Sequence, residues 1–266
     1  MKVSVITPSF NQGAFIQRTL DSVVSQRGDF ELEYLVVDGG STDETLSILR
    51  RYEGRLRFIS EKDAGQSDAI NNGFRMTSGS IVAWLNSDDT YEPGALDTVA
   101  RTLRGTGARW CFGECGIIDA QDREIHRAIS LYKRWVAGRY SLRRLLGRNF
   151  IPQPATFFRR ELLEEAGPID PELHLAMDYD LWLRFGRLAE PAFVSRRLAN
   201  FRRHGESKSG ARYRAMAWEC FNIARSRARG LERVALAEHL IHFAAELAVY
   251  RLFDLKAALL PESPNE

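Results

Sequence analysis

The sequence predicts an α/β protein with a mostly parallel sheet flanked by helices. In the first half of the chain, short apolar runs rich in valine and isoleucine alternate with amphipathic stretches, which is typical of repeated βαβ units. The composition agrees, because 266 residues with 44% hydrophobic and 27% charged side chains are enough to bury one large core. Internal repeats and low-complexity tracts are absent from the sequence.

Each element of the first half has a local reason. A short run of buried-type residues predicts a strand, and apolar residues spaced three and four apart predict a helix with one buried stripe. The predicted strands are residues 3–7, 33–37, 56–59 and 80–89, and the predicted helices are residues 13–26, a helix around Leu46–Leu49, one ending near Gly79 and one opening at Pro93.

The second half shows a weaker version of the same alternation. Its predicted strands are residues 109–113, 116–125 (a hairpin around Gln121), 152–158 and 192–201, and its predicted helices are residues 131–146, 161–167, 178–188 and most of 212–260. The chain is therefore expected to have a first half at about 1–115, a second half at about 116–210, and a helical C-terminal extension at 211–266.

The charge pattern excludes one class of partner and leaves another open. With 37 basic and 35 acidic residues the net charge is +2, so bulk charge gives no sign of a nucleic-acid-binding protein. Between residues 196 and 233, however, eleven Arg or Lys face three Glu, a local net charge of +8. This basic segment is either a solvated arginine face or a surface that docks an anionic membrane, a partner subunit or a second copy of the chain.

The sequence predicts a cytoplasmic protein. Its N-terminus lacks the apolar stretch of about 7–15 residues that a secretory signal needs, and we expect no membrane span. The spacing of the three cysteines fits neither a zinc site nor a redox pair, so reduced thiols are expected. Peripheral association with the inner membrane face is the alternative that the basic segment leaves open.

Polar residues follow three of the predicted strands, at residues 7–11, 38–41 and 86–89. Ligands of open α/β sheets bind at the carboxyl ends of the strands, so one pocket is expected to gather all three segments. Asp88 and Asp89 supply the oxygen ligands that Mg²⁺ or Mn²⁺ prefers. Their alternative role is to cap the helix that opens at Pro93. No G-x-G-x-x-G sequence is present, which removes the main signal for an NAD enzyme.

Several ordered motifs together resemble the nucleotide-sugar domain of family 2 glycosyltransferases. They are VSVITPSFNQGAFIQRTLDSVVSQ, YLVVDGGSTDET, EKDAGQSDAINNGF, GSIVAWLNSDDTYEPGAL, IPQPATFFRRELLEEAGPID, MDYDLWLRF and LANFRRHGESKS, and they cover roughly residues 1–210. The resemblance implies a GT-A fold (a Rossmann-like nucleotide-diphospho-sugar transferase) over residues 1–210, with a donor-binding half at about 1–115 and an acceptor half at about 116–210. It also implies transfer of a sugar from a UDP- or GDP-type donor to a hydroxyl of a glycan or lipid-linked acceptor, in surface polysaccharide or glycoconjugate synthesis.

The resemblance assigns donor-binding roles to the first two strand tips and to the segment around the third helix. Asp38 matches the acid that binds the nucleotide base, although an Asx turn at Asp38–Gly40 is the structural alternative. Thr7, Pro8 and Phe10 match the segment lining the base, with Phe10 either a stacking surface or a core residue. The remaining matches, each of which is otherwise loop or cap chemistry, are Asp63, Gln66, Asp68 and Asn71 on the donor side and Gln153 on the acceptor side.

The expected cofactor is a divalent cation, Mn²⁺ or Mg²⁺. The family signature Asp-x-Asp stands here as Asn86-Ser87-Asp88, with Asp89 following, so Asp88 matches the metal ligand and the other three line the donor. Asn86 keeps hydrogen bonding but brings no charge, so we expect weaker metal affinity. His204 matches a C-terminal ligand of the metal or diphosphate, or is otherwise a surface residue. Its neighbours Arg202, Arg203 and Lys208 are expected to pair with phosphate oxygens.

An inverting transfer needs a base that takes the proton of the acceptor hydroxyl. MDYDLWLRF resembles the Glu-Asp motif of the family, with Met177 in place of the Glu and Asp178 as the catalytic base. The structural alternative is that Asp178 is a helix N-cap. Because Asn86 and Met177 replace usual acids, the rival hypothesis is a catalytically impaired nucleotide-sugar-binding or regulatory protein of the same fold.

Overall fold

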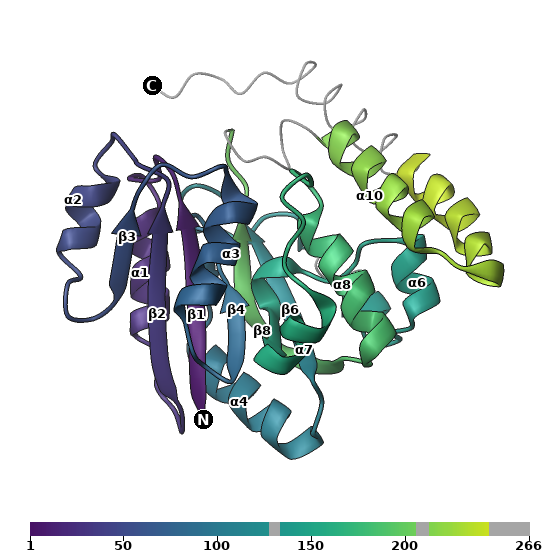
Figure 1. Ribbon diagram of the computed structural model, residues 1–266, viewed down its shortest axis with the longest axis horizontal. Coiled ribbons are helices and arrows are strands. Elements are labelled where there is room, and N and C mark those ends of the chain that lie inside the picture. The colour runs from purple at the N-terminus through teal and green to yellow at the C-terminus, as the bar shows by residue number, and fades with distance from the viewer. Residues whose placement is uncertain (128–133, 206–212, 245–266) are drawn as a thin grey trace.

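The computed structural model describes residues 1–127, 134–205 and 213–244. In these segments the strands form one eight-stranded mixed sheet in the order β3-β2-β1-β4-β7-β6-β8-β5 (Figure 1). The strands are β1 (Lys2–Ser9), β2 (Glu31–Asp38), β3 (Arg57–Ser60), β4 (Ile81–Trp84), β5 (Thr90–Tyr91), β6 (Trp110–Ile118), β7 (Thr156–Arg159) and β8 (Ala192–Arg202). The helices are α1 (Ile16–Val24), α2 (Thr45–Arg50), α3 (Gln66–Met76), α4 (Ala95–Thr106), α6 (Leu142–Gly147), α7 (Arg160–Ala166), α8 (Met177–Leu188) and α10 (Tyr213–Arg227), with 3₁₀ turns η1 (Gln153–Ala155) and η2 (Gly230–Val234).

The predicted parallel sheet is confirmed in the half that contains β1. This strand pairs in parallel with β2 and β4, and β2 pairs in parallel with β3. Alternate residues of β1 enter different cores: Val3 and Val5 pack with α1, α2 and α4, whereas Ile6 packs with α3, α7 and α8 on the other face. The polar segments after β1, β2 and β4 consequently lie at one edge of the sheet.

The second half departs from the prediction in its strand directions. β7 runs antiparallel to both β4 and β6, so the sheet is mixed. The strand predicted for residues 152–158 is wrong at its start, which forms η1, because Pro152 and Pro154 have no N–H to donate to a sheet ladder. Only the residues from Thr156 onward pair with the sheet.

The two strands predicted between residues 109 and 125 are a single strand, β6. The apparent break at Gly113 and Glu114 is a shift in register against β8, so the strand continues through a bulge. The predicted hairpin is reduced to one bridge between Ile118 and Glu124. The predicted helix 131–146 begins outside the described residues; residues 134–137 are helical, and α6 starts afresh after Ser141, whose Oγ accepts a hydrogen bond from the Arg144 N–H.

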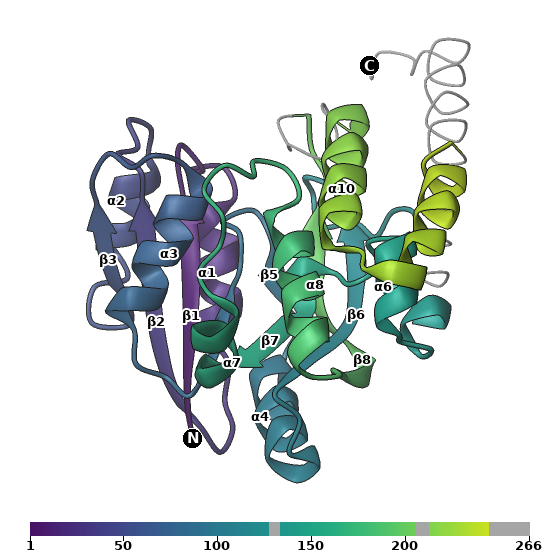
Figure 2. The same ribbon diagram turned by 45° about the vertical axis from the view of Figure 1, so that its right-hand side comes forward.

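The C-terminal helices pack against the acceptor half. Figures 1 and 2 both show α10 beside α8, and the predicted helical extension is described as far as residue 244. Cys220, Ile223 and Ala224 of α10 belong to the same hydrophobic cluster as Tyr179 and Leu183 of α8. The boundary expected near residue 210 therefore separates two sequence patterns that share one core. Within the described residues, no helix is long and apolar enough to cross a membrane.

Candidate active site

Asp88 and His204 come together from segments 116 residues apart. Asp88 lies in the loop that follows β4, and His204 lies just beyond the end of β8. The Nε2 atom of His204 is 3.1 Å from Oδ2 of Asp88, and their side chains are 8% and 19% exposed. The ring of Phe15 packs 4.5 Å from the His204 ring, centroid to centroid. The structure thus brings the two predicted metal ligands to one point at the carboxyl edge of the sheet.

Arg202 is fully buried and binds the loop that carries Asp88 and Asp89. Its backbone N–H donates to Oδ1 of Asp89 over 2.8 Å, its Nε donates to the carbonyl of Asp88 over 2.7 Å, and its Nη1 donates to the carbonyl of Asp119 over 2.8 Å. The expectation that Arg202 pairs with phosphate is therefore wrong, because its guanidinium is sequestered under the site. Arg203 was also predicted to pair with phosphate, and its Nη1 atom lies 3.2 Å from Nε2 of His126. The third predicted partner, Lys208, lies outside the described residues.

The two adjacent acids of the loop have different environments. Asp89 is fully buried, and burial together with the charge of Asp88 holds the pKa of its carboxyl well above the usual range. Asp88 keeps an oxygen at the surface beside His204. Neither caps α4, since the N-cap of that helix is Gly94 with no side-chain cap bond, so the capping alternative does not hold. Ser87, between them and Asn86, is buried, and its carbonyl accepts from the Thr19 hydroxyl over 2.9 Å.

A chain of side-chain amides joins the donor and acceptor sides through Asn86. Gln66, at the start of α3, donates to Oδ1 of Asn86 over 2.8 Å. The Nδ2 group of Asn86 donates to Oε1 of Gln153 over 3.2 Å, and Nε2 of Gln153 donates to the Trp84 carbonyl over 2.7 Å. An amide can accept on one side and donate on the other, which a carboxylate cannot do. Asparagine at position 86 is therefore chemically matched to its two glutamine neighbours.

Asp38 has the geometry of the Asx-turn alternative. Its carboxylate is fully buried and accepts from the N–H groups of Gly40 and Ser41 (3.1 and 2.9 Å) and from the hydroxyls of Ser41 and Ser60 (2.5 and 2.7 Å). Both oxygens are thus engaged within the chain. Contact with a nucleotide base remains a prediction for this residue.

The other predicted base-lining residues divide into buried and exposed. Thr7 is fully buried with its hydroxyl 3.0 Å from that of Tyr34, and Pro8 is buried. Phe10, by contrast, is 59% exposed, so the core alternative does not hold and its ring face is free to stack. Asn11, with a φ of 51°, ties this loop to the next one, because its N–H donates to Ser41 Oγ over 2.7 Å.

The acids around the start of α3 bind backbone groups of their own loop. Asp63 accepts from the Gly65 N–H over 2.9 Å, and Asp68 accepts from the Ala64 N–H over 3.3 Å. Asp63 also lies over Gly39, where an added Cβ would be 2.9 Å from its Oδ2. Asn71 is buried away from this rim, and its amide binds both the carbonyl and the N–H of Ile169 (2.8 and 3.0 Å).

Asp178 lies half-buried in the first turn of α8. The N-cap of this helix is Ala176, but Oδ1 of Asp178 accepts from the Tyr179 N–H over 2.8 Å, so Asp178 satisfies a first-turn N–H from inside the helix and not as its N-cap residue. Two successive residues of α3 place the start of α8 next to the strand-tip loop: Gln66 contacts Asn86, and the hydroxyl of Ser67 donates to Sδ of Met177 over 2.9 Å. The candidate base is therefore adjacent in the fold to the candidate donor site.

Sequence reasoning did not identify the residues that pack against the site residues or hold the backbone next to them. Phe15 and Ser67 lie within the motifs of the family resemblance but were given no role of their own, Glu219 lies in no motif, and Arg202 was assigned to the wrong partner. Phe15 is the N-cap residue of α1 and is half-buried against His204. Within the described residues no three His, Cys, Asp or Glu side chains form a metal cluster.

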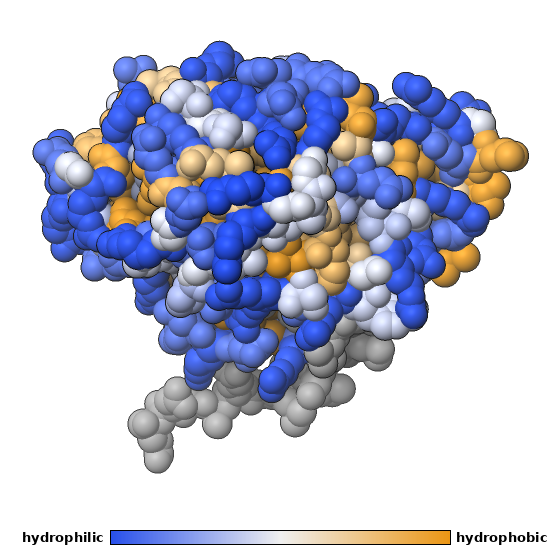
Figure 3. All heavy atoms as spheres, turned by 90° about the horizontal axis from the view of Figure 1, so that it is seen from below, coloured by the Kyte–Doolittle hydropathy of each residue, from blue (hydrophilic) through white to orange (hydrophobic). Residues whose placement is uncertain are grey.

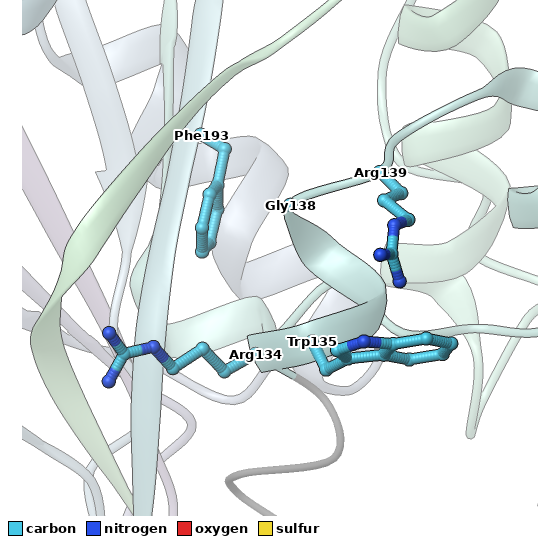
Figure 4. A pocket seen from close by; sticks show the side chains of 5 residues that line it. All are labelled: Arg134, Trp135, Gly138, Arg139 and Phe193. Atoms are coloured by element: carbon cyan, nitrogen blue, oxygen red, sulfur yellow. The ribbon is translucent and has the colours of Figure 1, made fainter.

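A separate surface pocket of about 380 Å³ contains none of the site residues. It is lined by Arg134, Trp135, Gly138, Arg139 and Phe193. Figure 4 shows Trp135 and Arg139 on one side of the helical turn and Arg134 pointing to the other. Phe193 stands at the opposite end of β8 from His204, so this pocket is not the donor site.

Known proteins share this architecture. The fold resembles that of S. aureus TarS (residues 1–349, in complex with UDP-GlcNAc), with a TM-score of 0.69 at 20% identity over 90% of this chain and 72% of that one. It also resembles the mannosyltransferase PcManGT from Pyrobaculum calidifontis (in complex with GDP-Man and Mn²⁺), with a TM-score of 0.66 at 20% identity over 98% and 81% of the chains. Against the longer TarS chain, the coverage falls to 43% of that chain. The fold is thus that of the GT-A glycosyltransferases.

The sequence comparisons identify the family. A model described as glycosyl transferase family 2 matches residues 4–167, which is more than half of the chain. A PGL/p-HBAD biosynthesis glycosyltransferase of Mycobacterium tuberculosis is 34% identical over 199 residues, which are 73% of this chain and 72% of that protein. The chain belongs to glycosyltransferase family 2 and is a glycosyltransferase. The predicted resemblance, fold class and enzyme class are confirmed.

Proposed function

We propose that this glycosyltransferase is inverting and divalent-cation-dependent, and that it transfers a sugar from a UDP- or GDP-sugar to a hydroxyl of a surface glycan or lipid-linked acceptor. The observation that carries the proposal is the pairing of Asp88 with His204 at the carboxyl edge of the sheet, beside the helix that bears Asp178. TarS bound to UDP-GlcNAc and PcManGT bound to GDP-Man support a nucleotide-sugar donor. The PGL/p-HBAD relative supports a glycan or glycolipid product.

The residues present fit a divalent cation. Two ligands about 2.1 Å from an octahedral ion and at right angles to each other are about 3 Å apart, and the Asp88 and His204 atoms are 3.1 Å apart. Mg²⁺ and Mn²⁺ are commonly held by one or two protein groups, with substrate phosphates completing the shell. Mn²⁺ in the PcManGT complex supports the same assignment. When bound, such an ion neutralises the charge that develops on the leaving diphosphate.

The side chains around that point have separate tasks in the mechanism. Asp88 and His204 orient the donor diphosphate, while the exposed ring of Phe10 offers a face on which the base stacks. Gln66 and Asn86, which are joined by a hydrogen bond, present their amide groups to hydroxyls of the ribose or sugar. The oxygen of the acceptor hydroxyl attacks the anomeric carbon while the bond from that carbon to the diphosphate breaks. Asp178 accepts the proton that the hydroxyl loses.

The end of the molecule formed by the C-terminal helices fits an anionic membrane that holds the acceptor. Figure 3 shows apolar surface at the right-hand edge, where these helices lie, and the exposed large apolar side chains of this region are Trp218, Leu231, Val234, Leu240 and Ile241. The exposed Arg225, Arg229 and Arg233 complement the negative charge of such a membrane. Flotation with phosphatidylglycerol vesicles, but not with neutral phosphatidylcholine vesicles, is the expected result. Equal recovery with both would contradict this docking.

The experiment that tests the proposed function is calorimetric titration with a panel of nucleoside diphosphates and their sugars, with Mn²⁺ or with chelator. We expect one nucleotide to bind in the presence of Mn²⁺ only, and Asp88→Ala to weaken that binding. Asp178→Asn should bind the donor as the wild type does but show no release of nucleoside diphosphate in a turnover assay. Binding by the wild type without any turnover would favour the impaired-protein hypothesis, and binding that chelator leaves unchanged would contradict metal dependence.

A further inference from the structure

A carboxylate from the C-terminal extension holds the start of the helix that carries Asp178. One oxygen of Glu219 on α10, Oε1, accepts hydrogen bonds from the N–H groups of Leu175 and Ala176, at 2.9 and 2.8 Å. These are the two residues immediately before α8, and the N-cap, Ala176, has no side chain able to do this. The position at which α8 begins is therefore fixed from outside its own segment.

Glu219 is not free to follow the loop it binds, because α10 is anchored along the same face. Ile223 and Arg227 stand four and eight residues further on, so they face α8 together with Glu219. Ile223 is buried in the shared hydrophobic cluster. The guanidinium of Arg227 binds Oδ1 of Asp180, with its Nε at 2.8 Å and its Nη2 at 2.7 Å. These contacts fix the position of α10, and with it the Glu219 carboxylate, along the axis of α8.

The opposite side of the same loop is held by the donor-side helix α3. Asn71 binds both backbone groups of Ile169, and the hydroxyl of Ser67 donates to the carbonyl of Leu173 over 3.3 Å and to Sδ of Met177 over 2.9 Å. The segment from Ile169 to Met177 is therefore clamped between α3 and α10. Asp178 is the next residue, directly after the segment that α3 and α10 hold in place.

We propose that Glu219 is a positioning residue for catalysis: its paired hydrogen bonds set the place and direction of the Asp178 carboxylate relative to the donor site. This inference rests on the proposed role of Asp178 as the base. Transfer depends steeply on alignment, since a displacement of about 1 Å at a catalytic group can cost about 100-fold in rate. The charge of Glu219 also lies at the positive end of the α8 dipole, where an anion is favourable.

The test measures kcat and donor KM from nucleoside diphosphate release, with the donor that the titration panel identifies. We expect Glu219→Ala to lower kcat about tenfold or more while donor KM stays within about twofold, because the donor site is untouched. Glu219→Gln should stay within about threefold of the wild type in kcat, because the amide oxygen accepts the same two bonds. Ser226→Ala, at an exposed residue of the same helix whose hydroxyl donates to the Ile223 carbonyl of that helix (2.8 Å), is the control and should leave both parameters unchanged.

Each other outcome decides against a stated part of the reasoning. Wild-type kcat in Glu219→Ala, with Asp178→Asn inactive, would overturn the positioning role and leave the base assignment intact. Wild-type turnover in Asp178→Asn would overturn both. An equal loss of kcat in the Gln and Ala variants would show that the hydrogen bonds are not the cause. If Glu219→Ala does not fold, Glu219→Asp carries the test, since its shorter side chain withdraws the acceptor and should lower kcat in the same way.

Discussion

Replacing Asn86 with aspartate tests how the loop after β4 is held. The Nδ2 group of Asn86 donates to Oε1 of Gln153 over 3.2 Å and lies 3.4 Å from Oδ2 of the buried Asp89. Asn86→Asp removes this donor and puts a second carboxylate beside Asp89, with Asp88 two residues away. We expect the variant to be less stable than the wild type, and more so at neutral pH than at acidic pH.

The size of the effect follows from these distances. Losing the hydrogen bond to Gln153 costs about 1 kcal/mol of the free energy of unfolding. Two full charges 3.4 Å apart repel by about 5 kcal/mol at an effective dielectric of about 20. This is an upper limit, because the raised pKa of the Asp89 carboxyl, caused by burial and by the charge of Asp88, lets the pair share a proton. We therefore expect a net loss of about 2–4 kcal/mol at pH 7.5.

The direction of the pKa shift determines how the free energy of unfolding changes with pH. A carboxyl whose folded pKa lies above its unfolded value is destabilising at high pH, and the penalty disappears once the pH falls below the unfolded pKa of about 4. Urea unfolding followed by tryptophan fluorescence at pH 7.5 and 5.0 measures this, because Trp84 and Trp182 are buried nearby. The control is Asn86→Ala, which adds no charge. It also removes the acceptor of Gln66 and the amide that lowers the pKa of Asp89, so its loss should be larger at pH 7.5 than at pH 5.0, but by less than that of Asn86→Asp. If Asn86→Asp matched it at both, the reasoning about Asp89 would be refuted.

Three further predictions concern the rest of the molecule. Although burial opposes it, hydrogen bonds from Ser4, the Ser78 N–H and Lys2 lower the pKa of Glu33 to about 2, so its stabilisation is complete above about pH 4.5 and is lost as the pH falls through 2. Glu33→Gln should therefore melt below the wild type at pH 7, with the gap narrowing as the pH falls from about 4.5 toward 2. Asp180→Asn should lower the free energy of unfolding by about 3–5 kcal/mol in urea, because it leaves two arginines without their buried partner, and a smaller loss than from Arg227→Met would contradict this. His204→Ala should weaken Mn²⁺-dependent nucleotide binding about tenfold in calorimetry, whereas an unchanged affinity would remove His204 from the site.

The parallel half of the fold could be predicted because its signals are local. Strands β1 and β2 are rich in valine, leucine and isoleucine, and each ends in polar residues whose place at the sheet edge follows from parallel pairing. The same logic brought Asp88 to the site. His204 required the family resemblance, since no local pattern relates residue 204 to residue 88. The direction of β7 was beyond local reasoning, because its partner in β4 is some 75 residues away in sequence.

Burial of charged residues was the other property that local patterns did not reveal. The sequence around Arg202 and Arg203 is two arginines before a histidine, and nothing in it distinguishes the fully buried side chain from the partly exposed one. The difference arises from the alternation of β8, which turns Arg202 under the Asp88–Asp89 loop. Asp88 and Asp89 also differ in burial although they are identical in chemistry: Asp89 is fully buried, whereas the Asp88 side chain is 19% exposed beside His204.

Helix α10 connects the stability of residues 116–210 with the geometry of the helix that carries the proposed base, Asp178. Glu219 and Arg227 are eight residues apart on one face, and they bind the backbone before α8 and the buried Asp180 within it. A rotation or shift of α10 along its axis would break both contacts together, since a helix moves as a rigid body over two turns. We therefore expect a displacement of α10 to shift the start of α8 and, with it, Asp178. Contact of the C-terminal helices with a membrane, through their exposed apolar and basic side chains, is one event that would cause such a displacement. The family model ends at residue 167, so this coupling involves a part of the chain that lies outside the matched domain.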